Sequence, residues 1–469
     1  MKEKEEFPIA TSWGLRILLS VLMLAYSAWA ASPKEQIIYD FGNGNLGAYP
    51  SSGLIFDASG KLYGTAPSGG PAGHGTIFQL SPPPSKGDAW TATPLYSFVG
   101  GAAAAEPYAD LAADGAGNFY GTTLGGGQFG YGTVFELKPS AAPGEWIATV
   151  LYSFAGGSDG ALPYAHLIFD NAGNLYGTTF FGGTGCVEGC GTVFQLTPTN
   201  SSAWQERVIY RFQGGSDGTG PFAGLVMDER GTLYGTTIDG GAYGCGTAFG
   251  PELSASPSIG DSGDVLRRPF VPMVAGLDGT VFQLKPPHKI SGVWTHTVLH
   301  SFGSGNDGAN PYAGLTRDGE GNLYGTTIFG GNVGCGFAAA TCGTVFEVKP
   351  PHTKGGAWRE AVILEFPAGG RGGFGPYAGL TLDGKGNFYG ATEFGGDGTC
   401  NYGCGVVFRL KPPPGKNGGW LETVLHNFEG GSDGTNPAAG LILDRQGKAY
   451  GTTSYGGSGG TGTVFRIVP

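Results

Sequence analysis

The sequence repeats one unit of about 57 residues seven times, and this repetition limits the fold more than any other feature. Each unit contains L-Y-G-T or a close variant, preceded by P-Y-A-G-L-x-x-D-x-x-G-N. A glycine-rich stretch, G-T-V-F-x-L-x-P, G-x-W and V-L-Y-S-F follow it. The four β-rich runs, separated by Gly, Pro, Asn and Asp, predict four short strands joined by tight turns. The central tyrosines are Tyr63, Tyr120, Tyr176, Tyr234, Tyr324, Tyr389 and Tyr450.

The copies of the fourth strand are offset along the chain from those of the other three strands, which indicates a closed ring. The first three strands occur seven times, but only six copies of the fourth strand follow them. The remaining copy is at the other end, where Ile-Ile-Tyr-Asp-Phe at 37–41 matches Val-Leu-Tyr-Ser-Phe at 150–154. We therefore predict an all-β, seven-bladed β-propeller with four-stranded blades, closed by pairing of 37–41 with 464–468 in the last blade.

The composition fits a packed repeat protein rather than a disordered one. The 92 Gly and 31 Pro are offset by a hydrophobic fraction of 40%, which is enough to bury a large core. The interval between the fourth and fifth tyrosines is longer than the others, and it contains G-T-A-F at 246–249 and then G-T-V-F at 279–282. This displacement predicts a loop insertion at 250–278 in blade 4.

The N-terminal residues have the order of a secretory signal. The apolar run at 17–25 is preceded by Arg16 and followed by Ala-Trp-Ala at 28–30. We predict a signal peptide at 1–30 and a propeller at 31–469, located outside the cytoplasm as a secreted, periplasmic or cell-surface protein. No membrane span is expected after cleavage. An uncleaved N-terminal anchor is the alternative, because three glutamates offset the basic residues before the apolar run.

Charge and motifs exclude several classes of function. The net charge is −11 and no cluster of Lys or Arg interrupts it, so nucleic acid is not an expected partner. The sequence has no nucleophile elbow, zinc-protease motif or phosphate-binding loop in a suitable context. The glycine runs open no helix, so no dinucleotide site is expected. We predict no cofactor and no metal.

The unit resembles the GloVer (Gloeo_Verruco) tandem repeat of exported bacterial proteins. Its first half, P-Y-A-G-L-T-R-D-G-E-G-N-L-Y-G-T-T at 311–327, is also similar to NHL-type propeller repeats. The resemblance covers nearly all of the chain after the signal. It implies a propeller fold, but it implies no reaction and no catalytic residues.

Residues that recur in every unit are expected to be structural. The aspartate before x-x-G-N should accept hydrogen bonds from turn amides, and the glycine after each tyrosine should permit close approach of the next sheet. The aspartates are Asp57, Asp114, Asp170, Asp228, Asp318, Asp383 and Asp444. The tyrosines and the phenylalanines of G-T-V-F should pack between neighbouring blades.

Six cysteines form three pairs, each inside one loop between the second and third strands. In an exported protein such pairs predict disulfides, with a zinc or redox site as the alternative, although no histidine lies at ligand spacing. The pairs are Cys186 with Cys190, Cys335 with Cys342, and Cys400 with Cys404. Cys245 stands alone and is predicted to be a free thiol or a link to another chain.

Departures from the repeat supply the candidate site residues. Asp110 and His166 replace the usual glycine of A-G-L in blades 2 and 3, so a carboxylate–imidazole pair near the channel could serve acid–base chemistry. A hydrogen-bonded pair that only fills space is the alternative. Four aromatics before Gly-Gly could form a ligand-binding rim, with packing under the adjacent loop as the alternative. They are Phe181, Phe329, Phe394 and Tyr455.

Four further aspartates lie in turns between blades. They lack the D-x-D-x-D spacing of a calcium loop, so a turn role is favoured over a metal site. They are Asp159, Asp217, Asp307 and Asp433.

Three functions remain open. The leading hypothesis is a monomeric binding or scaffold module whose loop-rich face meets an extracellular protein or carbohydrate. The second is an extracellular enzyme, a lyase or hydrolase, with its site near the central channel. The third is a cell-surface structural protein that binds copies of itself.

Overall fold

The structure is a computed structural model, and it describes most of the chain after the predicted signal. The described ranges are 33–85, 87–200, 203–242, 278–289, 292–303, 306–331, 342–367, 372–415 and 418–468, with the backbone alone at 334–337 and 340–341. The predicted signal at 1–30, Cys245 and the predicted insertion at 250–278, apart from Asp278, lie outside these ranges.

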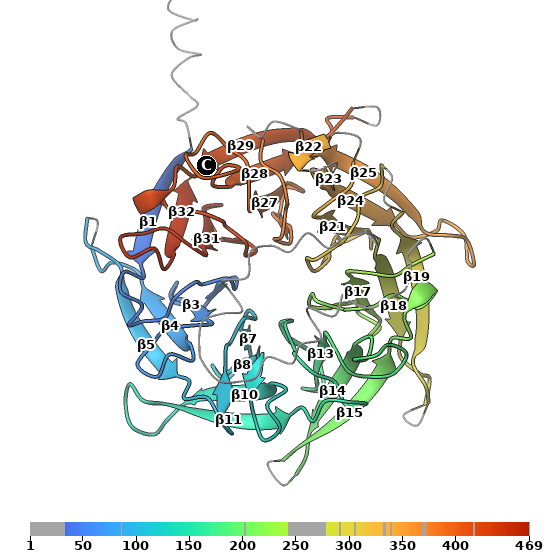
Figure 1. The fold of residues 1–469 in the computed structure, drawn as a ribbon, viewed down its shortest axis with the longest axis horizontal. Coiled ribbons are helices and arrows are strands. Elements are labelled where there is room, and N and C mark those ends of the chain that lie inside the picture. The colour runs from blue at the N-terminus through green and yellow to red at the C-terminus, as the bar shows by residue number, and fades with distance from the viewer. Residues whose placement is uncertain are drawn as a thin grey trace, which may run out of the picture.

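Seven four-stranded antiparallel sheets form the ring in Figure 1, and we number these blades 1 to 7. In each blade the first strand lies nearest the axis and the fourth lies at the rim. Blades 1 to 4 comprise β2 (Ile55–Phe56), β3 (Leu62–Ala66), β4 (Thr76–Ser81) and β5 (Thr91–Ser97); β7 (Ala112–Ala113), β8 (Phe119–Thr123), β10 (Thr133–Pro139) and β11 (Trp146–Ser153); β12 (Ile168–Phe169), β13 (Leu175–Thr179), β14 (Thr192–Pro198) and β15 (Trp204–Arg211); and β16 (Val226–Met227), β17 (Leu233–Thr237), β18 (Thr280–Lys285) and β19 (Thr295–Ser301).

The other three blades repeat the same order. They comprise β20 (Thr316–Arg317), β21 (Leu323–Thr327), β24 (Thr344–Lys349) and β25 (Arg359–Glu365); β26 (Thr381–Leu382), β27 (Phe388–Thr392), β28 (Val406–Lys411) and β29 (Leu421–Asn427); and β30 (Ile442–Leu443), β31 (Ala449–Thr453), β32 (Thr463–Val468) and β1 (Lys34–Asp40). Short accessory pairs join β6 (Ala104–Ala105) to β9 (Gly125–Gly126) and β22 (Gly334–Phe337) to β23 (Ala340–Thr341). Two 3-10 turns occupy Gly215–Asp217 and Gly431–Asp433. Within the described ranges, no helix is long and apolar enough to cross a membrane.

The predicted ring closure is confirmed. Strand β1 is the rim strand of blade 7 and pairs antiparallel with β32, from Lys34 opposite Val468 to Asp40 opposite Thr463. The Phe41 N–H continues the contact by donating to the carbonyl of Gly462 at 3.1 Å. In Figure 1 the blue N-terminal strand lies beside the red C-terminal one. The two ends of the chain therefore complete one sheet.

The recurring aspartate fixes the turn between the first and second strands, as the sequence predicts. Asp170 Oδ1 accepts hydrogen bonds from the backbone N–H groups of Ala172 and Asn174, both at 2.9 Å. Its Oδ2 accepts from the side chains of Asn174 at 2.7 Å and Tyr176 at 3.0 Å. Burial alone would raise the pKa of Asp170, but the hydrogen bonds from Asn174 and Tyr176 outweigh it and lower this pKa. Both oxygens thus serve the scaffold.

The apolar core lies between neighbouring blades, with one local difference from expectation. One cluster joins Phe78 and Leu80 of blade 1 to Tyr450 and Val464 of blade 7. The glycine after each tyrosine does not receive the next sheet. A Cβ on Gly64 would lie 2.7 Å from the Phe78 ring, which belongs to the same blade. The close approach is therefore internal to a blade, because the ring of the third strand folds over the second.

Candidate functional site

A cavity of about 440 Å³ lies on the axis of the ring, where the first strands of the blades begin. Part of its lining comes directly before the first strands, and part comes directly after the second strands of blades 6 and 7. Both positions lie at the same end of the blades, so the cavity opens on the face that carries the loops between second and third strands. We call this the loop face.

Strand alternation decides which side chains reach the cavity. In Pro163-Tyr164-Ala165-His166-Leu167 the first, third and fifth residues are buried, whereas Tyr164 and His166 are half-buried and line the cavity. This period of two points every second side chain at the axis. At the position of Tyr164, the seven blades in order carry Ser51, Tyr108, Tyr164, Phe222, Tyr312, Tyr377 and Ala438.

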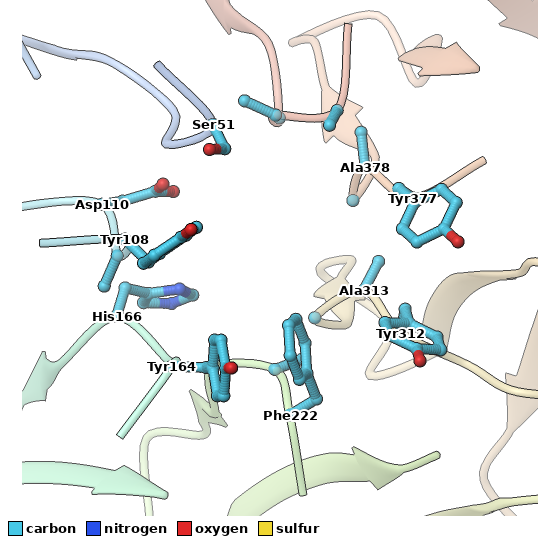
Figure 2. Close-up of a pocket in the computed structure, with 18 of the residues that line it drawn as sticks. Ser51, Tyr108, Asp110, Tyr164, His166, Phe222, Tyr312, Ala313, Tyr377 and Ala378 are labelled. Carbon is cyan, nitrogen blue, oxygen red and sulfur yellow. The ribbon is translucent and has the colours of Figure 1, made fainter. Parts of the chain in front are cut away.

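The five aromatic rings at this position form a continuous arc over blades 2 to 6 (Figure 2). The Tyr108 and Tyr164 ring centroids are 6.0 Å apart, and Tyr164 stacks on Phe222 at 4.5 Å. Tyr312 lies 5.1 Å from Phe222 and 5.4 Å from Tyr377. Because each ring is held by its neighbours, the arc offers an ordered aromatic surface to the cavity.

The opposite side of the cavity, on blades 6, 7 and 1, is more polar. Ser51 and Ala438 are small, so residues behind them reach the cavity: Glu393, Ser454 and the paired rings of Tyr49 and Tyr455, whose centroids are 5.4 Å apart. In blades 2 to 5 the residues equivalent to Glu393 and Ser454 are apolar and buried. They are Leu124, Phe180, Ile238 and Ile328. The cavity therefore has an aromatic sector and a polar sector.

Asp110 and His166 both line the cavity, but each leans toward a different neighbour. Asp110 Oδ1 accepts a hydrogen bond from the N–H of Gly53 in blade 1. His166 lies across Gly224 in blade 4, where an added Cβ would meet the imidazole at 2.1 Å. Each side chain thus fills the space left by a glycine of the adjacent blade. Figure 2 shows both projecting into the same central space.

Glu393 is the carboxyl group whose ionisation the cavity perturbs most. Burial raises its pKa to about 7, although a hydrogen bond from Asn436 acts in the opposite direction. Burial also raises the pKa values of Tyr377 and Tyr455, and the negative charge of Glu393 contributes to both increases. Glu393 is therefore close enough to act electrostatically on rings at two points of the cavity wall.

Only two of the four aromatics predicted to form a rim lie in the cavity wall. Phe394 and Tyr455 line the cavity. Phe181 packs on Phe180 at 4.6 Å and bridges Ala161, while Phe329 bridges Ala309; neither lies in the cavity wall. All but Tyr455, which is 37% exposed, are half-buried.

The aromatics of P-Y-A line the cavity, but they are not predicted as site residues from the sequence, because residues that recur in the repeat are expected to be structural. Their loss in blades 1 and 7 alone, at Ser51 and Ala438, was a signal that could have identified them.

Two predicted disulfides are present in the loops. They join Cys186 to Cys190 and Cys400 to Cys404. Cys342 is disulfide-bonded as well, whereas the side chains of Cys335 and Cys245 lie outside the described part of the chain. Disulfides are typical of proteins outside the cytoplasm.

The aspartates between blades accept hydrogen bonds from turn amides, as predicted: the Gln213 N–H donates to Asp217 Oδ2 and the Glu429 N–H to Asp433 Oδ2, both at 2.7 Å. Asp217 accepts from the Tyr210 hydroxyl at 2.6 Å, and Asp433 contacts His426 Nε2 at 3.2 Å from the equivalent place. Glu35, His426 and Asp433 each have one potential ligand atom, and these three atoms lie within 4.8 Å of one another, a spacing that a metal ion could use. Because Tyr210 makes the same contact as His426, the turn role accounts for this pair without a metal.

The ring of sheets defines a seven-bladed β-propeller, with an axial cavity that opens on the loop face. The chain belongs to the Gloeobacter/Verrucomicrobia repeat family, whose sequence model matches residues 25–249 and 274–465. No curated protein matches it.

Solved structures align with this chain at low sequence identity. A PL25 ulvan lyase bound to -[GlcA(1-4)Rha3S]- aligns with a TM-score of 0.51 and 11% identity, covering 92% of this chain and 95% of the other. A 6-phosphogluconolactonase, assigned as such only provisionally, from Bacteroides uniformis aligns with a TM-score of 0.47 and 15% identity, covering 83% and 88%.

Proposed function

We propose that the protein is an exported carbohydrate-binding module that holds a saccharide in the axial cavity. The division of the cavity wall into an aromatic sector and a polar sector carries this proposal. Sugar rings present apolar C–H faces, which stack on aromatic rings, and hydroxyl groups, which need hydrogen-bond partners. The arc from Tyr108 to Tyr377 suits the first requirement. Ser51, Ser454 and Glu393 suit the second.

The size and setting of the cavity agree with this role. Its volume of about 440 Å³ lies within the range of about 300–1,000 Å³ typical of small-molecule sites. The disulfides and the signal predicted from the sequence support a location where polysaccharides are met outside the cell. The closed propeller also holds the aromatic side chains in place before the ligand binds, which lowers the entropic cost of binding.

A glycan-array screen of residues 31–469, followed by calorimetric titration of the hits, tests the proposal. The double variant Tyr164→Ala, Tyr312→Ala should weaken binding at least about tenfold, since a ring at the centre of a binding site is worth ~1 kcal/mol or more. Phe129→Ala is the matched control, because this ring is 51% exposed and lies outside the cavity wall. Equal affinity of the double variant and the intact protein would disprove the site.

An enzyme acting on the bound saccharide is a second proposal. Asp110 and His166 line the same cavity, and side chains of these two types commonly act as general acid and base. Incubation with each glycan that binds, followed by assay of new chain ends, separates the two functions. Products that form with the intact protein but not with His166→Ala or Asp110→Asn would favour the enzyme. Recovery of every bound glycan unchanged would favour the binding module.

A further inference from the structure

We infer that the axial cavity selects a ligand that carries an ammonium group, such as a saccharide with a free amino group. The inference rests on the proposed function and names the charge of its ligand. It depends on three features of the cavity: the charges of its wall, the aromatic rings that face it, and a carboxylate oxygen that has no partner among the described residues.

The wall carries two acidic groups, whereas its one basic side chain among the described lining residues is a histidine. Asp110 and Glu393 line the cavity, and His166 is the remaining ionisable residue there apart from the tyrosines. Among the described lining residues there is no Lys or Arg. Anion-binding sites normally supply such cations, so a uronate or sulfate in this cavity would meet like charges without compensation.

The aromatic arc adds to the negative potential. The faces of aromatic rings attract cations, and cages of several rings are a recurring way to recognise ammonium groups. Tyr164 and Phe222 stack side by side in the arc, and the Glu106 carboxylate lies close enough to help burial raise the pKa of Tyr164 to about 12. The aromatic rings and the carboxylates therefore both favour a positively charged ligand.

The carboxylates would also gain a partner. Asp110 Oδ1 accepts a hydrogen bond from the Gly53 N–H, whereas Oδ2 has no hydrogen-bond donor among the described residues. Glu393 is half-buried in the cavity wall, and the protein atoms around it raise its pKa. A carboxylate removed from water is costly unless it is paired, so a bound ammonium group would relieve this cost.

The test is calorimetric titration of residues 31–469 with oligosaccharides of equal length at a pH of about 7, where a large share of the sugar amines and of the Glu393 carboxyl groups is ionised. One carries free amino groups, one is its N-acetylated form and one is built from uronic acids. Choline is a fourth probe, because its quaternary ammonium is charged at every pH. The amino form should bind at least about tenfold more tightly than the N-acetylated form. The uronate form should bind least.

The isosteric variants Asp110→Asn and Glu393→Gln remove charge with little change in shape. Each should bring the affinity for the amino form toward that for the N-acetylated form, while leaving the latter nearly unchanged, which also shows that the variant is folded.

Four other outcomes are decisive. Equal affinity for the amino and N-acetylated forms, or a preference for uronates, would overturn the inference and leave the proposed function standing. Persistence of the amino preference in both variants would also overturn it. Binding of choline without any saccharide would support ammonium selectivity and refute the saccharide. Binding of no probe would refute both.

Discussion

Removal of the closing strand should greatly destabilise the ring. Deletion of residues 31–42 removes β1, in which Ile38 is 8% exposed, and Phe41, which is 2% exposed. Burial of a large apolar side chain contributes ~1.5–3 kcal/mol, so these two alone account for ~3–6 kcal/mol. The deletion also leaves the backbone of β32 unpaired along its outer edge. A loss of this size is comparable to the net stability of a typical domain.

Thermal unfolding followed by circular dichroism measures the effect. The truncated protein should melt at a much lower temperature and with a broader transition. Phe98 has the position of Phe41 in blade 1 and is equally buried, so Phe41→Ala and Phe98→Ala should each cost ~3–5 kcal/mol. A truncated protein that melts like the intact one, or a Phe41→Ala variant far more stable than Phe98→Ala, would refute the closure argument.

Three other predictions concern single side chains. Asp170→Ala should lower the free energy of unfolding by ~2 kcal/mol or more in urea titration, since it leaves two turn amides unpaired. Burial raises the pKa of Glu422 from 4.5 to about 7, so the unfolded carboxyl releases its proton first and stability falls as pH rises from 4.5 through 7. The melting temperature should therefore be higher at pH 5 than at pH 8, by a smaller margin in Glu422→Gln. If choline binds, its affinity should rise between pH 6 and pH 8 as Glu393 ionises, and Glu393→Gln should reduce that rise. A choline affinity that rises equally in the variant would assign the effect to another group.

The fold could be predicted from the sequence because each strand assignment can be compared among the copies of the repeat. Each strand is recognised seven times, and the mismatch in the number of fourth strands leaves 37–41 as the strand that completes the ring. Turn chemistry was equally predictable, since an aspartate before x-x-G-N has a short list of backbone donors within reach.

The site was less predictable, because side-chain direction depends on space that the sequence does not show. Asp110 and His166 occupy equivalent positions in adjacent blades, yet one leans back toward Gly53 and the other forward over Gly224. The glycines on either side, rather than the positions themselves, set these directions. The cavity itself arises from residues spread over all seven blades. Its asymmetry becomes visible only when one position is compared around the whole ring.

The pairing of β1 with β32 has a consequence for the order of events during synthesis. Lys34 leaves the ribosome more than four hundred residues before its partner Val468. Throughout that interval β1, which contains Ile37, Ile38 and Tyr39, has no sheet to join, while blades 1 to 6 can already form from contiguous chain. Contacts so distant in sequence form slowly, and a waiting strand invites pairing with other chains. The final blade should therefore be the last to fold, and the newly synthesised chain should be most prone to aggregate just before its C-terminal strand is complete.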